Sequence, residues 1–177
     1  MKMNLLKKPL ASLMFWTLMS SLTCALDAEN GKNTDPEIAR GPNMTVSTTG
    51  MVAGKKFLIE NQQKTGIITR PSGLQYKITR AGSGPKPQLS DRVTVHYSGR
   101  LINGIEFDSS YSRGKPISFS LTEVISGWTE ALQLMNVGSN WEVYIPSNLA
   151  YGSRGAPPTI GADETLIFKI ELIGIAK

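Results

Sequence analysis

Short runs of alternating or mainly apolar residues follow one another along the chain after Gly66, and segments rich in Gly, Pro, Asn and Asp separate them. Each run has the length of a β-strand, and the runs lie at residues 74–82, 92–100, 105–110, 117–121, 141–146 and 165–175. Side chains alternate between the two faces of a strand, so residues two positions apart should share a face. In the clearest runs this rule assigns to one apolar face Val93, Val95 and Tyr97, then Ile117, Phe119 and Leu121, and then Leu166, Phe168, Ile170 and Leu172. The pattern predicts a sheet of five or six strands with one aromatic and aliphatic face.

Residues 127–135 have the spacing of a helix instead. Their apolar positions recur three and four residues apart, at Trp128, Ala131, Leu132 and Met135. The preceding Ser-Gly pair, residues 126–127, offers an acceptable N-cap. This helix must bury its apolar side, and the apolar face of the sheet provides a suitable surface. We therefore expect an α+β fold in which an antiparallel sheet carries one helix across one face. The domain should cover residues 66–177, a common size for a single domain.

The first 25 residues have the pattern of a secretory signal peptide. A basic start precedes a mainly apolar stretch at residues 10–22, and small residues precede a cut after Ala25. The stretch is short for a membrane-spanning helix, although an uncleaved anchor is the alternative. The only cysteine, Cys24, lies in a poor sequence context for lipidation, which is therefore disfavoured. We expect export through a cleavable signal peptide, to the periplasm first, with the outer-membrane surface or secretion as alternatives.

Two further segments precede the predicted domain. Residues 26–50 are polar and rich in Asn, Thr, Gly and Pro, so we interpret them as a flexible arm. Residues 51–65 can form a short helix or a linker, and their few apolar residues cannot bury much surface alone.

The net charge becomes small once the predicted signal peptide is set aside. The chain has 19 basic and 14 acidic residues, which give a formal net charge of +5 at pH 7. Three of the basic residues and none of the acidic ones lie in residues 1–25, so 16 minus 14 leaves +2. This balance does not indicate a nucleic-acid-binding protein.

Residues for covalent or metal-dependent catalysis are scarce. The only histidine, His96, falls on the polar face of its strand and has no cysteine to pair with in the processed chain, which disfavours a Ser-His-Asp or Cys-His site. No HExxH motif, Cys/His ligand set or acidic calcium loop occurs, so we expect no metal and no cofactor. Residues 82–84 (GSG) fit a turn better than a phosphate-binding loop. The aromatic residues on or near the apolar face remain, and on composition alone they are more simply an ordinary core than a binding site.

The order of the motifs favours the binding site. The chain contains VTVHYSGRLINGIEFDSS, then GKPISFSL, VISGWTEALQLM, AYG and TLIFKIEL. This order resembles the FKBP family of peptidyl-prolyl cis-trans isomerases over about residues 66–177, and GLQYKI and WEVYIPSNLAYG look like the bacterial members called macrophage infectivity potentiators. The resemblance implies a five- or six-stranded antiparallel sheet wrapped around one short helix, and isomerisation of X-Pro bonds in exported proteins without covalent chemistry.

The resemblance also implies a set of site residues. It makes Trp128 the floor of a proline pocket, Asp108 a buried carboxylate that Arg113 supports, and the Tyr151 hydroxyl and the Ile125 amide donors to a substrate carbonyl. The residues expected to be catalytic are Tyr97, Phe107, Asp108, Tyr151 and Phe168. Those expected to bind substrate or macrolide are Arg113, Ile117, Phe119, Val124, Ile125, Trp128 and Ile160.

Two positions depart from the family. Ile117 stands where many eukaryotic members carry Phe, and Ala156 stands where some carry His, which should change macrolide contacts and substrate preference. The partners implied are proline-containing polypeptides, with macrolides such as rapamycin as inhibitors and no nucleic acid. We expect a monomer, because the potentiators' N-terminal dimerisation module has no counterpart in the sequence. Two alternatives remain: a binding or chaperone domain with the same pocket and little isomerase activity, and a surface adhesin whose arm does the binding.

Overall fold

The computed structural model describes residues 44–176 of the chain. The predicted signal peptide, Cys24 and residues 26–43 of the predicted arm lie outside the described residues.

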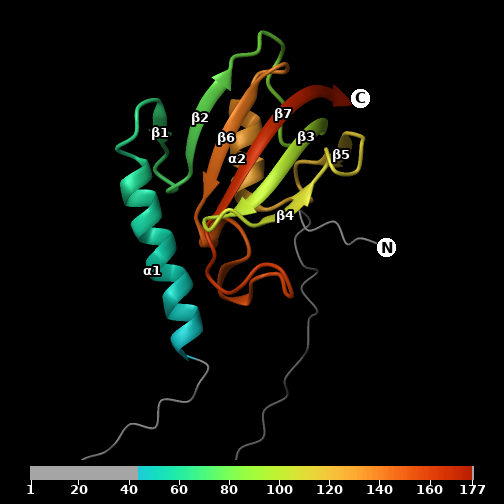
Figure 1. The fold of residues 1–177 in the computed structure, drawn as a ribbon. Coiled ribbons are helices and arrows are strands. Elements are labelled where there is room, and N and C mark those ends of the chain that lie inside the picture. The colour runs from blue at the N-terminus through green and yellow to red at the C-terminus, as the bar shows by residue number, and fades with distance from the viewer. Residues whose placement is uncertain (1–43, 177) are drawn as a thin grey trace, which may run out of the picture.

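Within residues 44–176, seven strands form one antiparallel sheet (Figure 1). Their bounds are β1 Ile67–Thr69, β2 Gln75–Arg80, β3 Arg92–Leu101, β4 Glu106–Ser109, β5 Ile117–Ser120, β6 Asn140–Ile145 and β7 Leu166–Ala176. The order across the sheet is β1-β2-β6-β7-β3-β4, and β5 also pairs with β3. The six predicted strands are present. The seventh strand, β1, was not predicted, because its three residues are too few to show an alternating pattern.

The two long central strands, β3 and β7, carry the core. Burial alternates along β3, where Val93, Val95 and Tyr97 are 0% exposed while Thr94 and His96 are only partly buried. The predicted core residues of β7 are likewise buried, with Lys169 exposed on the opposite face. The predicted faces of these strands are thus confirmed. A one-residue shift of register would expose the whole apolar set, so this alternation fixes how the strands pair.

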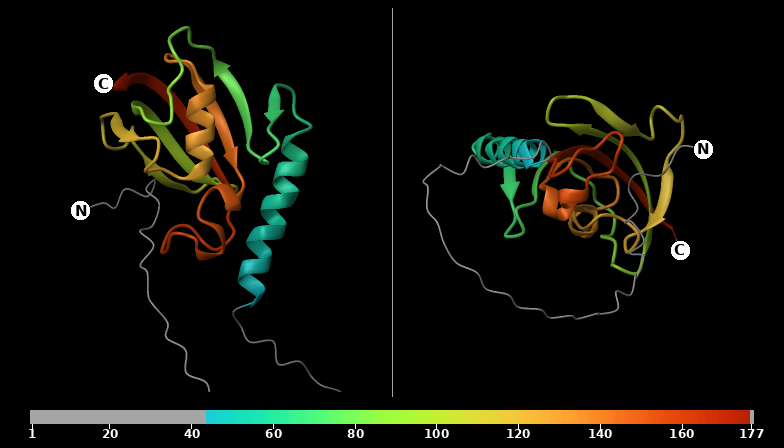
Figure 2. Two further views of the ribbon diagram at one scale, coloured as in Figure 1. Left: turned by 180° about the vertical axis from the view of Figure 1, so that it is seen from behind. Right: turned by 90° about the horizontal axis from the view of Figure 1, so that it is seen from below.

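Helix α2, Ser126–Leu134, lies across the apolar face of the curved sheet (Figure 2). It buries Trp128, Ala131 and Leu132 as its spacing predicted. The expected N-cap was wrong: Ile125 occupies this position, and no side chain caps the helix. Gly127 allows α2 to lie close to strand β6, because a Cβ at residue 127 would lie 2.5 Å from Cγ2 of Ile145.

A second helix, α1, spans Met44–Asn61 beyond the β1–β2 edge of the sheet (Figures 1 and 2). It begins before the expected helix at residue 51, so residues 44–50, which were expected in the flexible arm, are helical. The helix is docked rather than free. Asn61 donates to the Gln75 side chain at 3.0 Å, Gln75 donates to the Leu58 carbonyl at 2.9 Å, and a Cβ at Gly54 would lie 2.4 Å from Oγ1 of Thr165.

A cavity of about 370 Å³ lies between α1 and the sheet. Its lining includes Phe57 and Asn61 of α1 and Arg100, Glu142 and Tyr144 of the sheet. None of the helices between residues 44 and 176 is long and apolar enough to cross a membrane.

Candidate functional site

The indole of Trp128 lies at the centre of an aromatic cluster between α2 and the sheet. Its ring is 0% exposed. Tyr97, Phe119 and Phe168 present their rings to it at centroid distances of 5.2, 5.4 and 5.2 Å and at interplanar angles of 90°, 63° and 89°. Edge-to-face contacts of this kind are favourable beyond the burial of apolar area. The sequence predicted each of these residues on the apolar side, and the structure brings them together around one ring.

Phe107 extends the cluster toward the surface. It is partly buried, and its ring meets Phe168 at 5.5 Å and 85°. Gly99 on the adjacent strand β3 makes this contact possible, because a Cβ there would lie 2.7 Å from atoms of both phenylalanine rings. A side chain at residue 99 would push the two rings apart.

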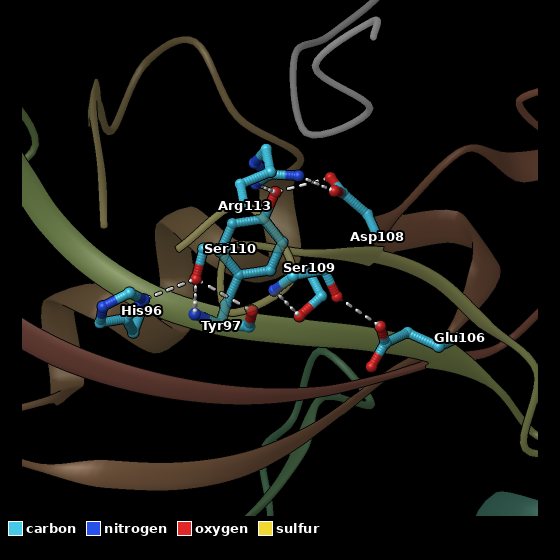
Figure 3. Close-up of polar contacts among 8 residues, drawn as sticks. His96, Tyr97, Glu106, Asp108, Ser109, Ser110 and Arg113 are labelled. Carbon is cyan, nitrogen blue, oxygen red and sulfur yellow. Dashed lines mark hydrogen bonds and ion pairs between the residues drawn. The ribbon is translucent and has the colours of Figure 1, made fainter. Parts of the chain in front are cut away.

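Beside this cluster, Tyr97, Asp108 and Arg113 form a hydrogen-bonded network (Figure 3). The Tyr97 hydroxyl donates to Oδ2 of Asp108 at 2.6 Å and accepts from Nη2 of Arg113 at 2.8 Å. Nη1 of Arg113 also donates to Oδ1 of Asp108, which closes the triangle. Strand β3 supplies Tyr97, β4 supplies Asp108, and the turn after β4 supplies Arg113. The Arg113 guanidinium also lies over the Tyr97 ring, 5.5 Å from its centroid.

This environment fixes the protonation of the network. Burial and the hydrogen bond to Asp108 raise the pKa of Tyr97 well above its ordinary value. Burial lowers the pKa of Arg113, but its hydrogen bonds to Asp108 and Tyr97 outweigh this effect and raise the pKa overall. Tyr97 therefore remains a neutral phenol and Arg113 a cation at neutral pH.

Tyr151 provides an unused donor. Its hydroxyl is buried and has no hydrogen-bond partner in the described part of the chain. Burial, followed by the negative charge of Asp108, raises the pKa of this hydroxyl, so it keeps its proton at neutral pH. A buried donor without a partner costs free energy. The hydroxyl is therefore suited to a carbonyl oxygen of a bound molecule.

The other predicted site residues belong to the same core. Val124, Ile125 and Ile160 are buried at 0%, 2% and 1% exposure, and Ile117 and Ala156 are partly buried and pack against the cluster. All twelve predicted site residues thus lie in the core cluster, against it, or in the polar network. The 370 Å³ cavity is elsewhere, on the α1 side of the sheet.

Ser110 is a buried polar residue near the site that the sequence pattern did not indicate. Ser110 is 0% exposed, and its hydroxyl contacts both the backbone of Tyr97 and the ring of His96. Its position two residues after Asp108 was visible in the sequence. Its partners were not, because they lie on β3 and become neighbours only when β4 pairs with that strand.

The fold and the site together define a class of α+β proteins in which a curved antiparallel sheet closes over one helix and the site between them is mainly aromatic. The profile of the family described as FKBP-type peptidyl-prolyl cis-trans isomerase matches residues 84–173. A second profile, the domain amino terminal to FKBP-type peptidyl-prolyl isomerase, matches residues 42–78, which include α1.

Curated relatives and solved structures agree with these profiles. "Outer membrane protein MIP" of Legionella longbeachae is 57% identical over 124 residues, which are 70% of this chain and 53% of the relative. "Peptidyl-prolyl cis-trans isomerase Mip" of Coxiella burnetii is 54% identical over 123 residues, 70% of this chain and 54% of the relative. The crystal structure of FkpA from Escherichia coli superposes with a TM-score of 0.71 at 41% identity, over 73% of this chain and 60% of that one.

The chain belongs to the FKBP-type peptidyl-prolyl cis-trans isomerase family, and its similarity to Mip proteins confirms the resemblance inferred from the motifs. It spans about half the length of the two Mip relatives.

Proposed function

We propose that this chain is a peptidyl-prolyl cis-trans isomerase that accelerates X-Pro isomerisation in exported polypeptides. The observation that carries the proposal is the protonated Tyr151 hydroxyl, which has no hydrogen-bond partner among residues 44–176 and lies beside an aromatic cluster centred on Trp128. This combination offers aromatic side chains for a proline ring, of which Phe107 is partly exposed, and a donor for the carbonyl next to it.

The reaction needs no nucleophile. Rotation about a peptide bond has a barrier of ~18–20 kcal/mol because amide resonance must be broken, and uncatalysed X-Pro isomerisation takes tens of seconds or longer. The twisted amide has less charge separation than the planar one, so apolar surroundings favour it. A site that binds the twisted form better than the planar form lowers the barrier, and a thousandfold acceleration requires only ~4 kcal/mol of such a difference.

Each part of the site has a role in this mechanism. Trp128 forms the base of the proline subsite. The partly exposed Phe107 and the buried Phe168 form the side of this subsite. The Tyr151 hydroxyl and the Ile125 backbone amide hold the substrate carbonyls, and the buried Phe119, Val124 and Ile160 and the partly buried Ile117 complete the apolar surroundings. The network of Tyr97, Asp108 and Arg113 keeps the polar edge of the site in place and transfers no proton.

Partners and location follow from the same proposal. The substrates are proline-containing polypeptides, and macrolides such as rapamycin compete for the aromatic site. The chain acts after export through the signal peptide predicted at residues 1–25. One relative's name, "Outer membrane protein MIP", supports an exported location.

The test is isomerase activity of the full chain on a short X-Pro peptide, measured by exchange NMR so that no coupling protease is needed. We expect Tyr151→Phe and Phe107→Ala each to lower kcat/KM at least tenfold. The matched controls are Tyr76→Phe and Phe57→Ala, because these rings pair with Trp141 and Tyr144, which are not among the proposed site residues. The controls should retain activity.

Rapamycin binding and inhibition distinguish an isomerase from a binding module with the same site. Inhibition of the wild-type chain at stoichiometric concentrations would support the site assignment. A folded chain that binds rapamycin but does not accelerate the exchange would contradict the isomerase proposal, and a binding module would then be the better description.

A further inference from the structure

The Ser110 hydroxyl is a junction of three hydrogen bonds at the end of β4 (Figure 3). It accepts the backbone N–H of Tyr97 at 2.7 Å and donates to the Tyr97 carbonyl at 3.1 Å. Its third contact is with Nδ1 of His96 at 2.9 Å. Because Ser110 is 0% exposed, protein groups must satisfy this hydroxyl.

The donors and acceptors at this junction indicate which ring nitrogen of His96 carries a hydrogen. A hydroxyl has one proton to donate and two lone pairs that accept. We assign the proton to the bond with the Tyr97 carbonyl, since a carbonyl can only accept, and the Tyr97 N–H uses one lone pair. The contact with His96 is then a hydrogen bond only if Nδ1 donates. Both the neutral ring with hydrogen on Nδ1 and the imidazolium provide that donor.

Ser110 connects the strand that carries Tyr97 to the segment that carries Asp108 and Arg113. On one side Ser110 holds the backbone of Tyr97, whose carbonyl also accepts the Ser110 N–H at 2.9 Å. On the other side Ser110 lies two residues after Asp108, and its carbonyl accepts the N–H of Arg113 at 3.2 Å. Movement of Ser110 would therefore change how the Tyr97 hydroxyl meets the Asp108 carboxylate.

The ring of His96 is itself held in place. Tyr111 stacks on it at 4.6 Å with an interplanar angle of 12°, and the Tyr111 hydroxyl reaches Oε2 of Glu171 at 3.4 Å. Its strand position places His96 on the face opposite the aromatic cluster, so the ring cannot touch a ligand bound there. An effect of His96 on that site therefore has to pass through its neighbours, and Ser110 is the neighbour whose hydroxyl bonds both the His96 ring and the backbone of Tyr97.

We infer that His96 and Ser110 are positioning residues for the proposed isomerase site, with His96 donating from Nδ1 to Ser110 and Ser110 holding Tyr97 against Asp108 and Arg113. The catalytic part of this inference rests on the proposed function. The tautomer of His96 does not depend on it.

The first experiment is a long-range ¹H–¹⁵N spectrum of the full wild-type chain at a pH where His96 is neutral. The chain has only one histidine, so the ring signals need no further assignment. We expect Nδ1 to carry the hydrogen and Nε2 to be the bare nitrogen. The opposite tautomer would overturn the inference, whatever the activity of the chain.

The second experiment measures kcat/KM for His96→Leu and His96→Asn. Leucine cannot donate, whereas the amide nitrogen of asparagine takes the place of Nδ1. We expect His96→Leu to lower kcat/KM about fivefold, the effect of one lost hydrogen bond, and His96→Asn to stay within about twofold of wild type. Thr94→Leu is the matched control, because Thr94 lies on the same face of β3 and its hydroxyl bonds Ser118 at 2.7 Å. It should not change kcat/KM.

A double-mutant cycle with Ser110→Ala tests the route of the effect. Ser110→Ala should lower kcat/KM more than His96→Leu, and adding His96→Leu to it should have no further effect. Additive effects, or a His96→Leu variant as active as wild type, would overturn the positioning role. A wild-type chain without isomerase activity would instead overturn the proposed function and the catalytic importance of His96, and would leave the tautomer result standing.

Discussion

Asp108→Asn should destabilise the fold, because both oxygens of the Asp108 carboxylate are already bound. One accepts from the Tyr97 hydroxyl at 2.6 Å and the other accepts from Arg113. Asparagine has the same shape but offers one acceptor oxygen and an NH₂ group that can only donate. At least one of the two bonds is therefore lost, and Arg113 loses its counter-charge.

The burial of the pair sets the size of the effect. The Asp108 side chain is 9% exposed and that of Arg113 is 31% exposed. Removing one partner of a fully buried pair costs about 3–5 kcal/mol, whereas a fully exposed pair contributes about 0–1 kcal/mol. Since the carboxylate is buried and the guanidinium still reaches water, we expect a loss of ~2 kcal/mol in the free energy of unfolding.

The assay is urea unfolding at pH 7, followed by tryptophan fluorescence, with Glu171→Gln as the matched control. Glu171 pairs with Arg80 at 2.7 Å, but these side chains are 29% and 58% exposed, so this loss should stay within about 1 kcal/mol. The m-values of both variants should equal that of wild type. If Asp108→Asn cost no more than Glu171→Gln, the network would contribute no more than a surface ion pair, and the role of Asp108 would be abandoned.

Two further predictions concern the packing of α1 and the buried tyrosines of the site. Gly54→Ala should destabilise the chain by about 1 kcal/mol in urea unfolding, although alanine is the better helix former, because its Cβ would lie 2.4 Å from Oγ1 of the buried Thr165. In a Thr165→Ala background the same change should destabilise less, because the contact with Oγ1 is lost and the 3.2 Å contact with Cβ of residue 165 remains, and an equal loss in both backgrounds would contradict the packing explanation. The stability should also fall above about pH 10, because the buried Tyr97 and Tyr151 keep their protons in the folded chain while the unfolded chain releases them near the ordinary pKa of 10.0. Stability is complete below that pH, and Tyr151→Phe should make the alkaline decline shallower in unfolding curves measured between pH 8 and 11.

The sequence predicted most of the sheet because alternation is a direct consequence of a pleated strand with one buried face. It predicted the apolar side of α2 for the same kind of reason, since Trp128 and Leu132 lie one turn apart. It did not predict the extent of α1. Residues 44–50 were expected in the polar arm, but in the structure Gly50 and Gly54 let the helix approach the segment 162–165, and a Cβ at Gly50 would lie 2.6 Å from the Ala162 carbonyl.

The aromatic part of the site could be inferred from face assignments and motif order, whereas only the family resemblance pointed to Asp108 and Arg113 as its polar part. Asp108 and Arg113 are five residues apart, so their pairing through a turn is a local possibility. The contact between Tyr97 and Asp108, and that between Ser110 and His96, joins two strands whose register decides which side chains meet. Register depends on the whole sheet, so no short stretch of sequence specifies these contacts.

The polar network also limits which mechanisms are compatible with this site. Burial and the hydrogen bond to Asp108 keep Tyr97 a neutral phenol, and burial and the negative charge of Asp108 do the same for Tyr151. Hydrogen bonds to Asp108 and Tyr97 keep Arg113 a cation. A general acid or base needs a pKa near the working pH, so that it can exchange its proton during the reaction. These three groups are shifted away from that range. The network is therefore suited to hold fixed dipoles and donors against a substrate. Such a site suits catalysis of X-Pro isomerisation, since the carbonyl must be oriented while the amide twists and no proton has to move.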